Sequence, residues 1–342
     1  MRAVIRGDAS GVQVAWVSDP RVEVSTDAVV RVVLASVCGT DLWAYRGEGG
    51  IPPGRRAGHE FLGVVQDVGA DVQGLREGDM VLAPFLWADG TCRPCRSGLP
   101  SSCARGGMWG GDHDGGQGEV VRVPFAEATL VRIGLGADDE RLPAVLTLAD
   151  VMATGAHAAR GARVTEGSVV AVVGDGAVGL CAVLAAHRAG AERILLLGRH
   201  PARTRVGVSF GATDVVAERG DEGLARVREL TDGLGADAVL ECVGTQLAVD
   251  TALSVARDGG AVALVGAPHG GIGDLGPLFL RNLTVSGGLA PARALIPPLL
   301  DEVLAGRLDP SPVFDLTTDL DGVPAAYRAM ADRTALKALV RI

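Results

Sequence analysis

The sequence predicts an α/β protein that combines a mostly β domain with a doubly wound parallel sheet. Short β-type runs separated by glycine, proline and aspartate fill residues 12 to about 124, which is typical of a mostly β domain. From residue 168, buried strands alternate with glycine turns and helices, which indicates a parallel sheet covered on both faces. The length of 342 residues, about twice that of a common single domain, agrees with two domains.

The individual elements follow from apolar runs and their boundaries. In the first part we expect strands at 29–34, 63–68 and 120–123. In the second part we expect strands at 169–173, 194–197, 236–240 and 261–265, with helices at 177–189, 201–210 and 247–256. After Gly288, helices near 295–304 and 323–331 and a strand near 335–340 are expected to return to the first domain.

The composition narrows the class of protein. The formal net charge is -9, so the chain lacks the basic surplus that binding to a phosphate backbone needs, and nucleic acid is not an expected partner. Residues 1–11 show no export signal. The most apolar region, 168–186, is interrupted by Asp175 and by glycines, which fits a buried strand and helix better than a membrane span. We therefore expect a cytoplasmic enzyme with no membrane partner.

A dinucleotide-binding motif follows the strand expected at 169–173. Gly174, Gly176 and Gly179 form a GxGxxG pattern that opens an apolar helix. The first glycine permits a tight turn, the second lets the backbone approach a pyrophosphate, and the third allows the helix to pack closely on the strand. The helix N-terminus adds partial positive charge. This context favours a Rossmann-type site over the alternative, a glycine turn in another α/β fold.

The end of the next strand predicts which cofactor binds. NAD-specific sites usually carry an acidic residue there, but this chain has Gly198, Arg199 and His200. Gly198 leaves room, and Arg199, His200 and Arg203 can form charge-assisted hydrogen bonds with a 2′-phosphate. We therefore expect NADP to be preferred over NAD. The alternative is that these basic residues are solvated positions of the helix that follows.

Three of the six cysteines lie within twelve residues. Asp89, Cys92, Cys95 and Cys103 have the spacing D-x2-C-x2-C-x7-C in a segment rich in glycine and proline. Four such ligands suit a closed tetrahedral zinc site, where the metal replaces a core that so short a lobe cannot form. The alternative is that Asp89 only caps a turn and the lobe holds no metal.

A second group of metal-ligand residues is spread along the first part of the chain. Cys38 stands in C-G-T-D, His59 and Glu60 stand in G-H-E, and Asp150 follows at a distance. A cysteine, a histidine and one carboxylate would leave an open position on zinc, as a catalytic Lewis acid needs. A single buried cysteine or histidine is more often a core residue, but the joint occurrence with the other motifs favours a metal site.

Together these motifs resemble the zinc-dependent medium-chain alcohol dehydrogenases over nearly the whole chain. The resemblance rests on C-G-T-D at 38–41, G-H-E at 58–60, the lobe at 89–103, Asp150 before T-G-x-H at 154–157, and G-D-G-A-V-G at 174–179. In this family a Rossmann domain is inserted into a GroES-like, mostly β catalytic domain. The resemblance implies a catalytic domain of residues 1–150 plus 291–342 and a dinucleotide-binding domain of residues 151–290.

The family also implies roles for individual residues. Cys38, His59 and Asp150 would hold the catalytic zinc, and Glu60 would be a neighbouring carboxylate that enters or leaves its coordination. Asp41 would orient His59, and Thr40 would relay the proton. The implied cofactor contacts are Thr154, Gly174, Gly176, Ala177, Val178, Gly179, Gly198, Arg199, His200, Arg203, Val243 and Val265. The chain departs from the family at Asp89, where the first of four cysteines is usual, and at Trp43, where many members have histidine.

The implied activity is reversible oxidation of a small-molecule alcohol, or reduction of an aldehyde or ketone, with zinc and NADP in a homotetramer or dimer. By family analogy Phe85, Leu86, Trp87 and Trp109 line an apolar substrate cleft, with a core role as the alternative. Two other functions remain open: a zinc-independent quinone or enone reductase of the same fold, and a non-catalytic NADP-binding regulator. The sequence does not identify the alcohol.

Overall fold

The computed structural model describes residues 1–342 except 8–10, 49–51 and 112. The chain divides into two compact units, the first made of Met1–Ala153 with Pro291–Ile342 and the second of Thr154–Ala290. Among the described residues, no helix has both the length and the apolar character needed to cross a membrane.

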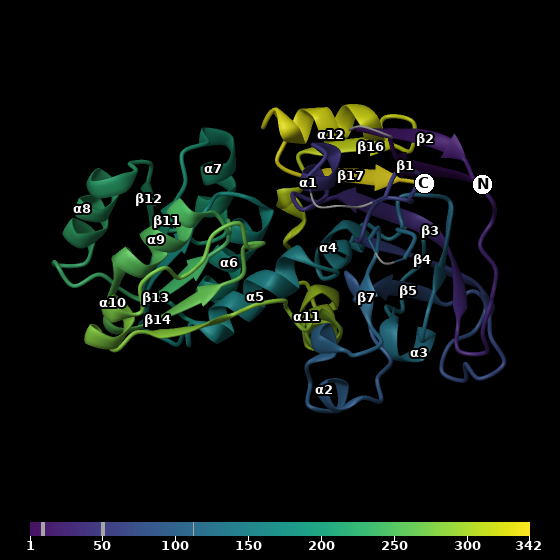
Figure 1. The fold of residues 1–342 in the computed structure, drawn as a ribbon, viewed down its shortest axis with the longest axis horizontal. Helices are drawn as coiled ribbons and strands as arrows, with labels where there is room; N and C mark the ends of the chain where they lie inside the picture. The colour runs from purple at the N-terminus through teal and green to yellow at the C-terminus, as the bar shows by residue number, and fades with distance from the viewer. Residues whose placement is uncertain (8–10, 49–51, 112) are drawn as a thin grey trace. The chain divides into compact units, whose positions relative to one another are not determined.

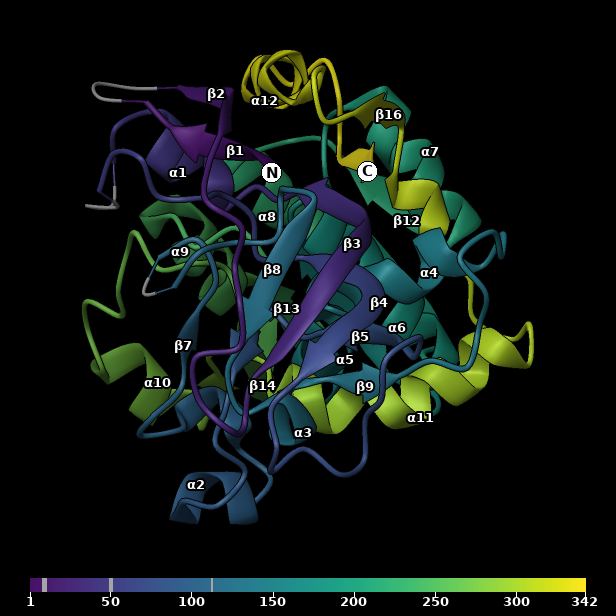
Figure 2. The same cartoon turned by 90° about the vertical axis from the view of Figure 1, so that its right-hand side faces the viewer.

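The first unit contains a large, mostly antiparallel sheet. Its strand order is β16 (Leu316–Asp319), β17 (Ala338–Arg341), β3 (Ala28–Val37), β4 (Phe61–Val68), β5 (Met80–Ala83) and β9 (Val131–Arg132), with β8 (Val120–Val123) paired to β3. Figure 2 shows β3, β4, β5 and β8 side by side. Strand β17 pairs antiparallel with β3, so the end of the chain extends the sheet that the N-terminal residues begin.

Shorter elements surround this sheet. They are the strand pairs β1 (Arg2–Arg6) with β2 (Val12–Trp16) and β6 (Leu86–Trp87) with β7 (Gly107–Met108), the helices α1 (Asp41–Tyr45), α2 (Arg93–Arg96), α3 (Ala126–Thr129), α4 (Leu142–Thr147), α11 (Ala292–Leu304) and α12 (Val323–Ala331), and the 3-10 turns η1 (Pro100–Ser102) and η2 (Ser311–Val313). The core of the unit includes Phe61, Trp109 and Tyr327, all fully buried.

The second unit contains a parallel sheet. Its strand order is β12 (Asp214–Val216), β11 (Arg193–Leu197), β10 (Val169–Val173), β13 (Ala236–Glu241), β14 (Ala256–Leu264) and β15 (Thr284–Gly287). The helices, labelled in Figure 1, are α6 (Ala177–Arg188), α7 (Pro201–Ser209), α8 (Gly220–Leu230), α9 (Gln246–Val255) and α10 (Gly276–Leu280), and α5 (Val151–Gly161) carries the chain into this unit.

In the second unit the strand order extends from β10 towards both edges of the sheet, through β11 and β12 on one side and through β13, β14 and β15 on the other. Helix α6 leads from β10 to β11, whereas α9 leads from β13 to β14 on the other side. Because such crossovers are right-handed, helices on the two sides cover opposite faces of the sheet, which makes it doubly wound. The carboxyl ends of β11, β10, β13 and β14 therefore meet at one edge, where ligands of this fold bind.

Most expected elements lie within one to three residues of the observed ones. The helix expected at 295–304 begins earlier, at Ala292, and contains Pro297 and Pro298. The last strand begins later than expected, at Ala338, because Leu336 and Lys337 first hydrogen-bond through their backbone N–H groups to the Asp315 carboxylate. In the second unit the expected elements did not include β12, α8, α10 or β15, and most short elements of the first unit were not expected either.

Candidate metal and cofactor sites

Cys38, His59 and Asp150 come together at one end of the sheet in the first unit. Cys38 directly follows β3, and His59 precedes β4 by one residue. Because Ala35 pairs with Phe61 in the antiparallel ladder, the end of β3 lies beside the start of β4. Asp150 arrives from the turn before α5, where the backbone N–H of Phe85 binds the carbonyl oxygen of Ala149.

The distances between these three side chains suit a tetrahedral zinc ion. Cys38 Sγ lies 3.5 Å from Asp150 Oδ2, and His59 Nε2 lies 3.4 Å from the same oxygen. Ordinary zinc bond lengths at tetrahedral angles separate sulfur from oxygen by about 3.6 Å and nitrogen from oxygen by about 3.4 Å. Ligand atoms of Cys38, His59, Asp150 and Glu60 all lie within 4.8 Å of one another, and all four residues are buried.

Asp41 fixes the orientation of His59. Its Oδ1 lies 3.1 Å from His59 Nδ1, and its Oδ2 accepts the backbone N–H of Cys38 at 2.9 Å. A proton on Nδ1 leaves the lone pair of Nε2 for a metal. Nε2 is buried and makes no hydrogen bond to any described residue. The imidazole therefore presents a free donor atom towards Asp150.

Electrostatics at this cluster favour a positive ion. Burial lowers the pKa of His59, but the negative charges of Asp41 and Cys38 and the Asp150 carboxylate next to Nε2 outweigh it and raise that pKa well above its usual value. Burial, and then the Glu60 carboxylate, raise the pKa of the Cys38 thiol. A metal ion that binds here must replace the thiol proton. The negative potential that raises the pKa of His59 also attracts such a cation.

A buried ion pair holds Glu60 beside the cluster. Lys337 Nζ and Ser36 Oγ both donate to Glu60 Oε2, and Glu60 Oε1 is buried without a hydrogen-bond partner among the described residues. Lys337 also donates to the carbonyl oxygen of Val37 at 3.4 Å. Lys337 was not among the site residues predicted from the sequence, although a signal was present: it is the one lysine among 32 lysine and arginine residues.

Thr40 lines a cavity of about 60 Å³ in the first unit, next to this cluster. Asp41, His59 and Trp109 line the same cavity. Thr40 is the N-cap residue of α1, yet its hydroxyl makes no capping hydrogen bond. Of the four residues expected at a substrate cleft, only Trp109 lines this cavity; Phe85 and Trp87 are buried, and Leu86 is not part of its lining.

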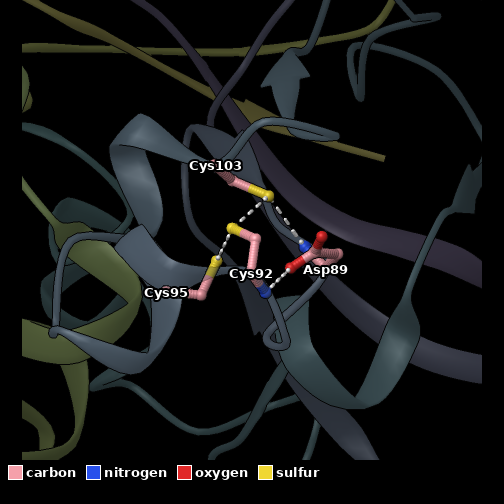
Figure 3. Close-up of side chains that lie close together, drawn as sticks. All are labelled: Asp89, Cys92, Cys95 and Cys103. Atoms are coloured by element: carbon pink, nitrogen blue, oxygen red, sulfur yellow. Dashed lines mark hydrogen bonds between the residues drawn. The ribbon is translucent and has the colours of Figure 1, made fainter.

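The lobe at 89–103 brings its three sulfur atoms together, as Figure 3 shows. Cys92 Sγ lies 3.5 Å from Cys95 Sγ and 3.7 Å from Cys103 Sγ. Two sulfurs on a tetrahedral zinc ion are separated by about 3.8 Å. One oxygen of Asp89 belongs to the same group, whose ligand atoms lie within 4.8 Å of one another. The donor set therefore fits zinc.

Asp89 also caps a turn. Its Oδ1 accepts the backbone N–H groups of Thr91 and Cys92, and its Oδ2 accepts Arg105 Nε at 2.8 Å. Burial opposes ionisation, but these bonds hold the pKa of Asp89 well below its usual range. The residue is thus a carboxylate with lone pairs left for a metal. Arg105, which the sequence analysis missed, offsets part of the negative charge of the thiolates.

The glycines of the dinucleotide motif meet the geometric demands of such a site. Gly174 directly follows β10 and has φ +112°, and Gly176 is the N-cap of α6. A Cβ on Gly179 would lie 2.0 Å from the carbonyl oxygen of Gly174, so only glycine allows the helix this close to the strand. Ala177 and Val178 form the first turn of α6.

The remaining cofactor candidates lie in the second unit. Gly198, Val243 and Val265 follow the carboxyl ends of β11, β13 and β14, at the same edge of the sheet as Gly174. Thr154 is buried in α5.

Asp175 occupies the space beside Gly198. Its Oδ2 accepts the backbone N–H groups of Arg199 and His200 at 2.9 and 3.0 Å and lies 2.9 Å from His200 Nδ1. Arg203 Nη1 lies 3.9 Å from Oδ1. A Cβ on Gly198 would lie 2.6 Å from the Asp175 Cβ, so the room expected there for a phosphate is partly filled. Asp175 organises the basic residues, a role that the sequence analysis missed.

Comparisons with known proteins agree with this arrangement. Residues 24–133 match the family model of the alcohol dehydrogenase GroES-like domain, and residues 177–305 match that of the zinc-binding dehydrogenase. The chain is 35% identical over 311 residues to zinc-type alcohol dehydrogenase B of Aspergillus flavus, covering 88% of this chain and 72% of that protein. It is 31% identical to an NADP-dependent isopropanol dehydrogenase of Thermoanaerobacter brockii, with 90% of each chain covered.

The fold has a close match among solved structures. The alcohol dehydrogenase TADH from Thermus sp. ATN1 superposes with a TM-score of 0.93 at 36% identity, over 100% of this chain and 99% of that one.

Proposed function

Because the chain belongs to the zinc-dependent medium-chain alcohol dehydrogenases, we propose that it transfers a hydride reversibly between an alcohol and NADP, using zinc bound by Cys38, His59 and Asp150. The observation that carries this proposal is the convergence of Cys38 Sγ, His59 Nε2 and Asp150 Oδ2. Three electron-pair donors meet in a buried place with no hydrogen-bond donor supplied to Nε2 by any described residue. Such a set suits a cation, which would replace the protons that Cys38 and His59 hold in its absence.

The residues around the proposed zinc position have different roles in the reaction. Zinc, when bound, supplies a Lewis acid that stabilises negative charge on the substrate oxygen. His59 is held in the metal-binding tautomer by Asp41. Thr40, whose hydroxyl is not engaged in capping, accepts the alcohol proton during oxidation as it passes its own proton on towards solvent, and the transfer runs in the opposite direction during reduction. Trp109 gives the cavity an apolar wall next to these polar groups.

The preference for NADP draws on Arg199, His200 and Arg203 at the end of β11. Arg199 is exposed, while the other two lie close to Asp175, and no acidic residue follows β11 where a ribose hydroxyl would be bound. The relative named as an NADP-dependent isopropanol dehydrogenase supports the same choice. Asp175 acts against it electrostatically, because its negative charge reduces the positive potential of the three basic residues.

We also propose a structural zinc ion on Asp89, Cys92, Cys95 and Cys103, and a homo-oligomer that works in the cytoplasm. Reduced cysteines in the lobe are consistent with that compartment. Exposed apolar side chains at Leu275, Phe279 and Leu280, close in sequence to the edge strand β15, support association between copies of the chain.

The direct test follows NADPH absorbance with a panel of aldehydes and ketones, and repeats the assay with the Cys38→Ser variant. We expect carbonyl reduction by the wild type, and a loss of about two or more orders of magnitude in the variant, since a hydroxyl replaces thiolate poorly on zinc. Reduction of an enone double bond that persists without zinc would instead support a quinone or enone reductase. NADP binding without any turnover would support the regulator.

A further inference from the structure

Arg6 is a partly buried cation that makes no ion pair with any described residue. Its Nε and Nη1 atoms are shielded from solvent and have no hydrogen-bond partner among the described residues. A guanidinium whose N–H groups are removed from water and left unpaired raises the free energy of the folded state, unless a ligand supplies the missing acceptor. Arg6 is the last residue of β1.

The same arginine lines the cavity that Thr40 and His59 share. Arg55, a second arginine, lines it as well, and the two are fixed side by side because the backbone N–H of Arg6 donates to the carbonyl oxygen of Arg55 at 3.0 Å. A group bound at these arginines would therefore lie in the same cavity as the proposed relay hydroxyl and the proposed zinc ligand.

Among the described residues, Arg6 is the arginine of the cavity lining that makes no ion pair. Arg55 Nη1 lies 3.7 Å from Asp114 Oδ1, so its charge is partly offset. Asp41 is the acidic residue among the described residues of the lining, and its two oxygens are engaged by His59 and by the backbone N–H of Cys38. Arg6 is thus the group whose charge calls for a partner.

The cavity itself is small. Its volume of about 60 Å³ has room for roughly five water molecules. A compact anionic group fits this space, whereas a large one does not. One guanidinium without an ion pair to a described residue also matches a monoanion better than the nearly doubly charged phosphate monoester.

We propose that the substrate of this enzyme is an alcohol or carbonyl compound that carries a carboxylate, and that Arg6, assisted by Arg55, binds that carboxylate. This inference rests on the proposed function, because it names the class of substrate for the same site. Arg6 would be a specificity-determining residue: it holds the charged end of the molecule while the other end reaches the proposed zinc position.

The test compares substrates that differ only in charge. With the zinc-loaded enzyme and NADP, kcat/KM is measured for a series of short hydroxycarboxylates, the corresponding primary amides and the corresponding phosphate monoesters. We expect the best carboxylate to exceed its amide by about 10- to 100-fold, the range of a charge-assisted hydrogen bond. The Arg6→Gln variant should bring that ratio close to one, and Arg6→Lys should restore part of it.

A matched variant controls for the change in net charge. Arg31 is exposed on β3 and does not line the cavity, so Arg31→Gln should keep the wild-type ratio. A purely structural role of Arg6 would lower the melting temperature and reduce kcat/KM for acid and amide equally, which would overturn the proposal. A preference for the phosphate esters over the carboxylates would also overturn it.

Binding of an unreactive acid separates this inference from the proposed function. Butyrate and butyramide are titrated calorimetrically into wild type and Arg6→Gln. If the enzyme turns over no alcohol, tighter binding of butyrate that Arg6→Gln abolishes would still support the carboxylate site. If neutral alcohols are turned over but butyrate binds no better than butyramide, the dehydrogenase function stands and the carboxylate site is wrong.

Discussion

Lys337 donates its buried ammonium group to the carboxylate of Glu60, and both side chains are 1% exposed. Burial lowers the pKa of Lys337, but the charge of Glu60 outweighs this effect and raises it. The pair links the last strand of the chain to the residues that follow His59.

Removing Lys337 should therefore destabilise the protein. Lys337→Met leaves the Glu60 charge buried and unpaired, and we expect the free energy of unfolding to fall by about 3–5 kcal/mol in chemical denaturation. Adding Glu60→Gln removes that charge and should recover a large part of the loss. A Lys337→Met variant as stable as wild type would show that the ion pair does not govern the stability of this region.

Asp41→Asn should weaken zinc binding and turnover together. The amide cannot hold His59 Nδ1–H as the carboxylate does, and its NH2 group would face either His59 or the N–H of Cys38. We expect kcat/KM and zinc affinity each to fall by about 10- to 100-fold. Asp67→Asn, an exposed change on β4, is the matched control and should behave as wild type. Normal zinc affinity in Asp41→Asn would contradict the orienting role.

Cys95→Ala tests whether the lobe at 89–103 binds a structural zinc ion. Loss of one thiolate should release the structural zinc, lower the melting temperature by roughly 5 °C or more and leave the other metal in place. Zinc content is measured by mass spectrometry beside thermal unfolding. Cys181→Ala changes a cysteine outside both clusters and should retain the wild-type zinc content. If Cys95→Ala also retains it, the lobe is empty.

Arg199→Ala tests the preference for NADP. Loss of its guanidinium should lower kcat/KM with NADPH by about 10-fold and change the value with NADH little, because only NADPH carries the 2′-phosphate. Arg205→Ala, an exposed change on α7, the helix that follows Arg199, should affect neither. Equal losses with both cofactors would place Arg199 away from the 2′-phosphate.

Asp175→Asn should reveal a pH-dependent contribution to stability. Burial alone would raise the pKa of Asp175, but its bonds to His200 and Arg199 lower it below the usual value. A carboxylate with a lowered folded-state pKa stabilises the fold above its unfolded pKa, about 3.9, and this contribution is lost as pH falls through the folded value. Wild type should thus exceed the variant by about 1–3 kcal/mol at neutral pH. If the difference in free energy of unfolding between wild type and Asp175→Asn persists at pH about 2, it does not come from the Asp175 charge.

Long apolar elements could be predicted from the sequence because their periodicity is strong. The buried run Val169–Val173 and the glycines after it specify a strand, a turn and a helix by local sterics alone. Strand β12 has three residues, and α8 is mostly polar, so neither produces a clear apolar pattern. Their positions depend on packing against neighbours that are distant in sequence.

In the candidate site, too, residues in local motifs could be predicted from the sequence, whereas residues that depend on long-range packing could not. Ligand types and motifs indicated Cys38, His59 and Asp150, because few residue types bind zinc. Lys337 lies 277 positions from Glu60, and its role depends on the pairing of β17 with β3, which no local pattern specifies. Arg6 was likewise missed, because an arginine near the N-terminus looks solvated until its burial is known.

The central claim is that turnover requires the metal bound by Cys38, His59 and Asp150. Its most direct test measures zinc content and NADPH-linked carbonyl reduction in the same samples of wild type and Cys38→Ser as zinc is removed and restored. We predict about two zinc ions per chain in wild type and about one in the variant. Activity of the wild type should disappear when the zinc ion at Cys38, His59 and Asp150 is removed and return when it is restored. Full turnover by metal-free protein, or an unchanged zinc content in Cys38→Ser, would contradict the claim.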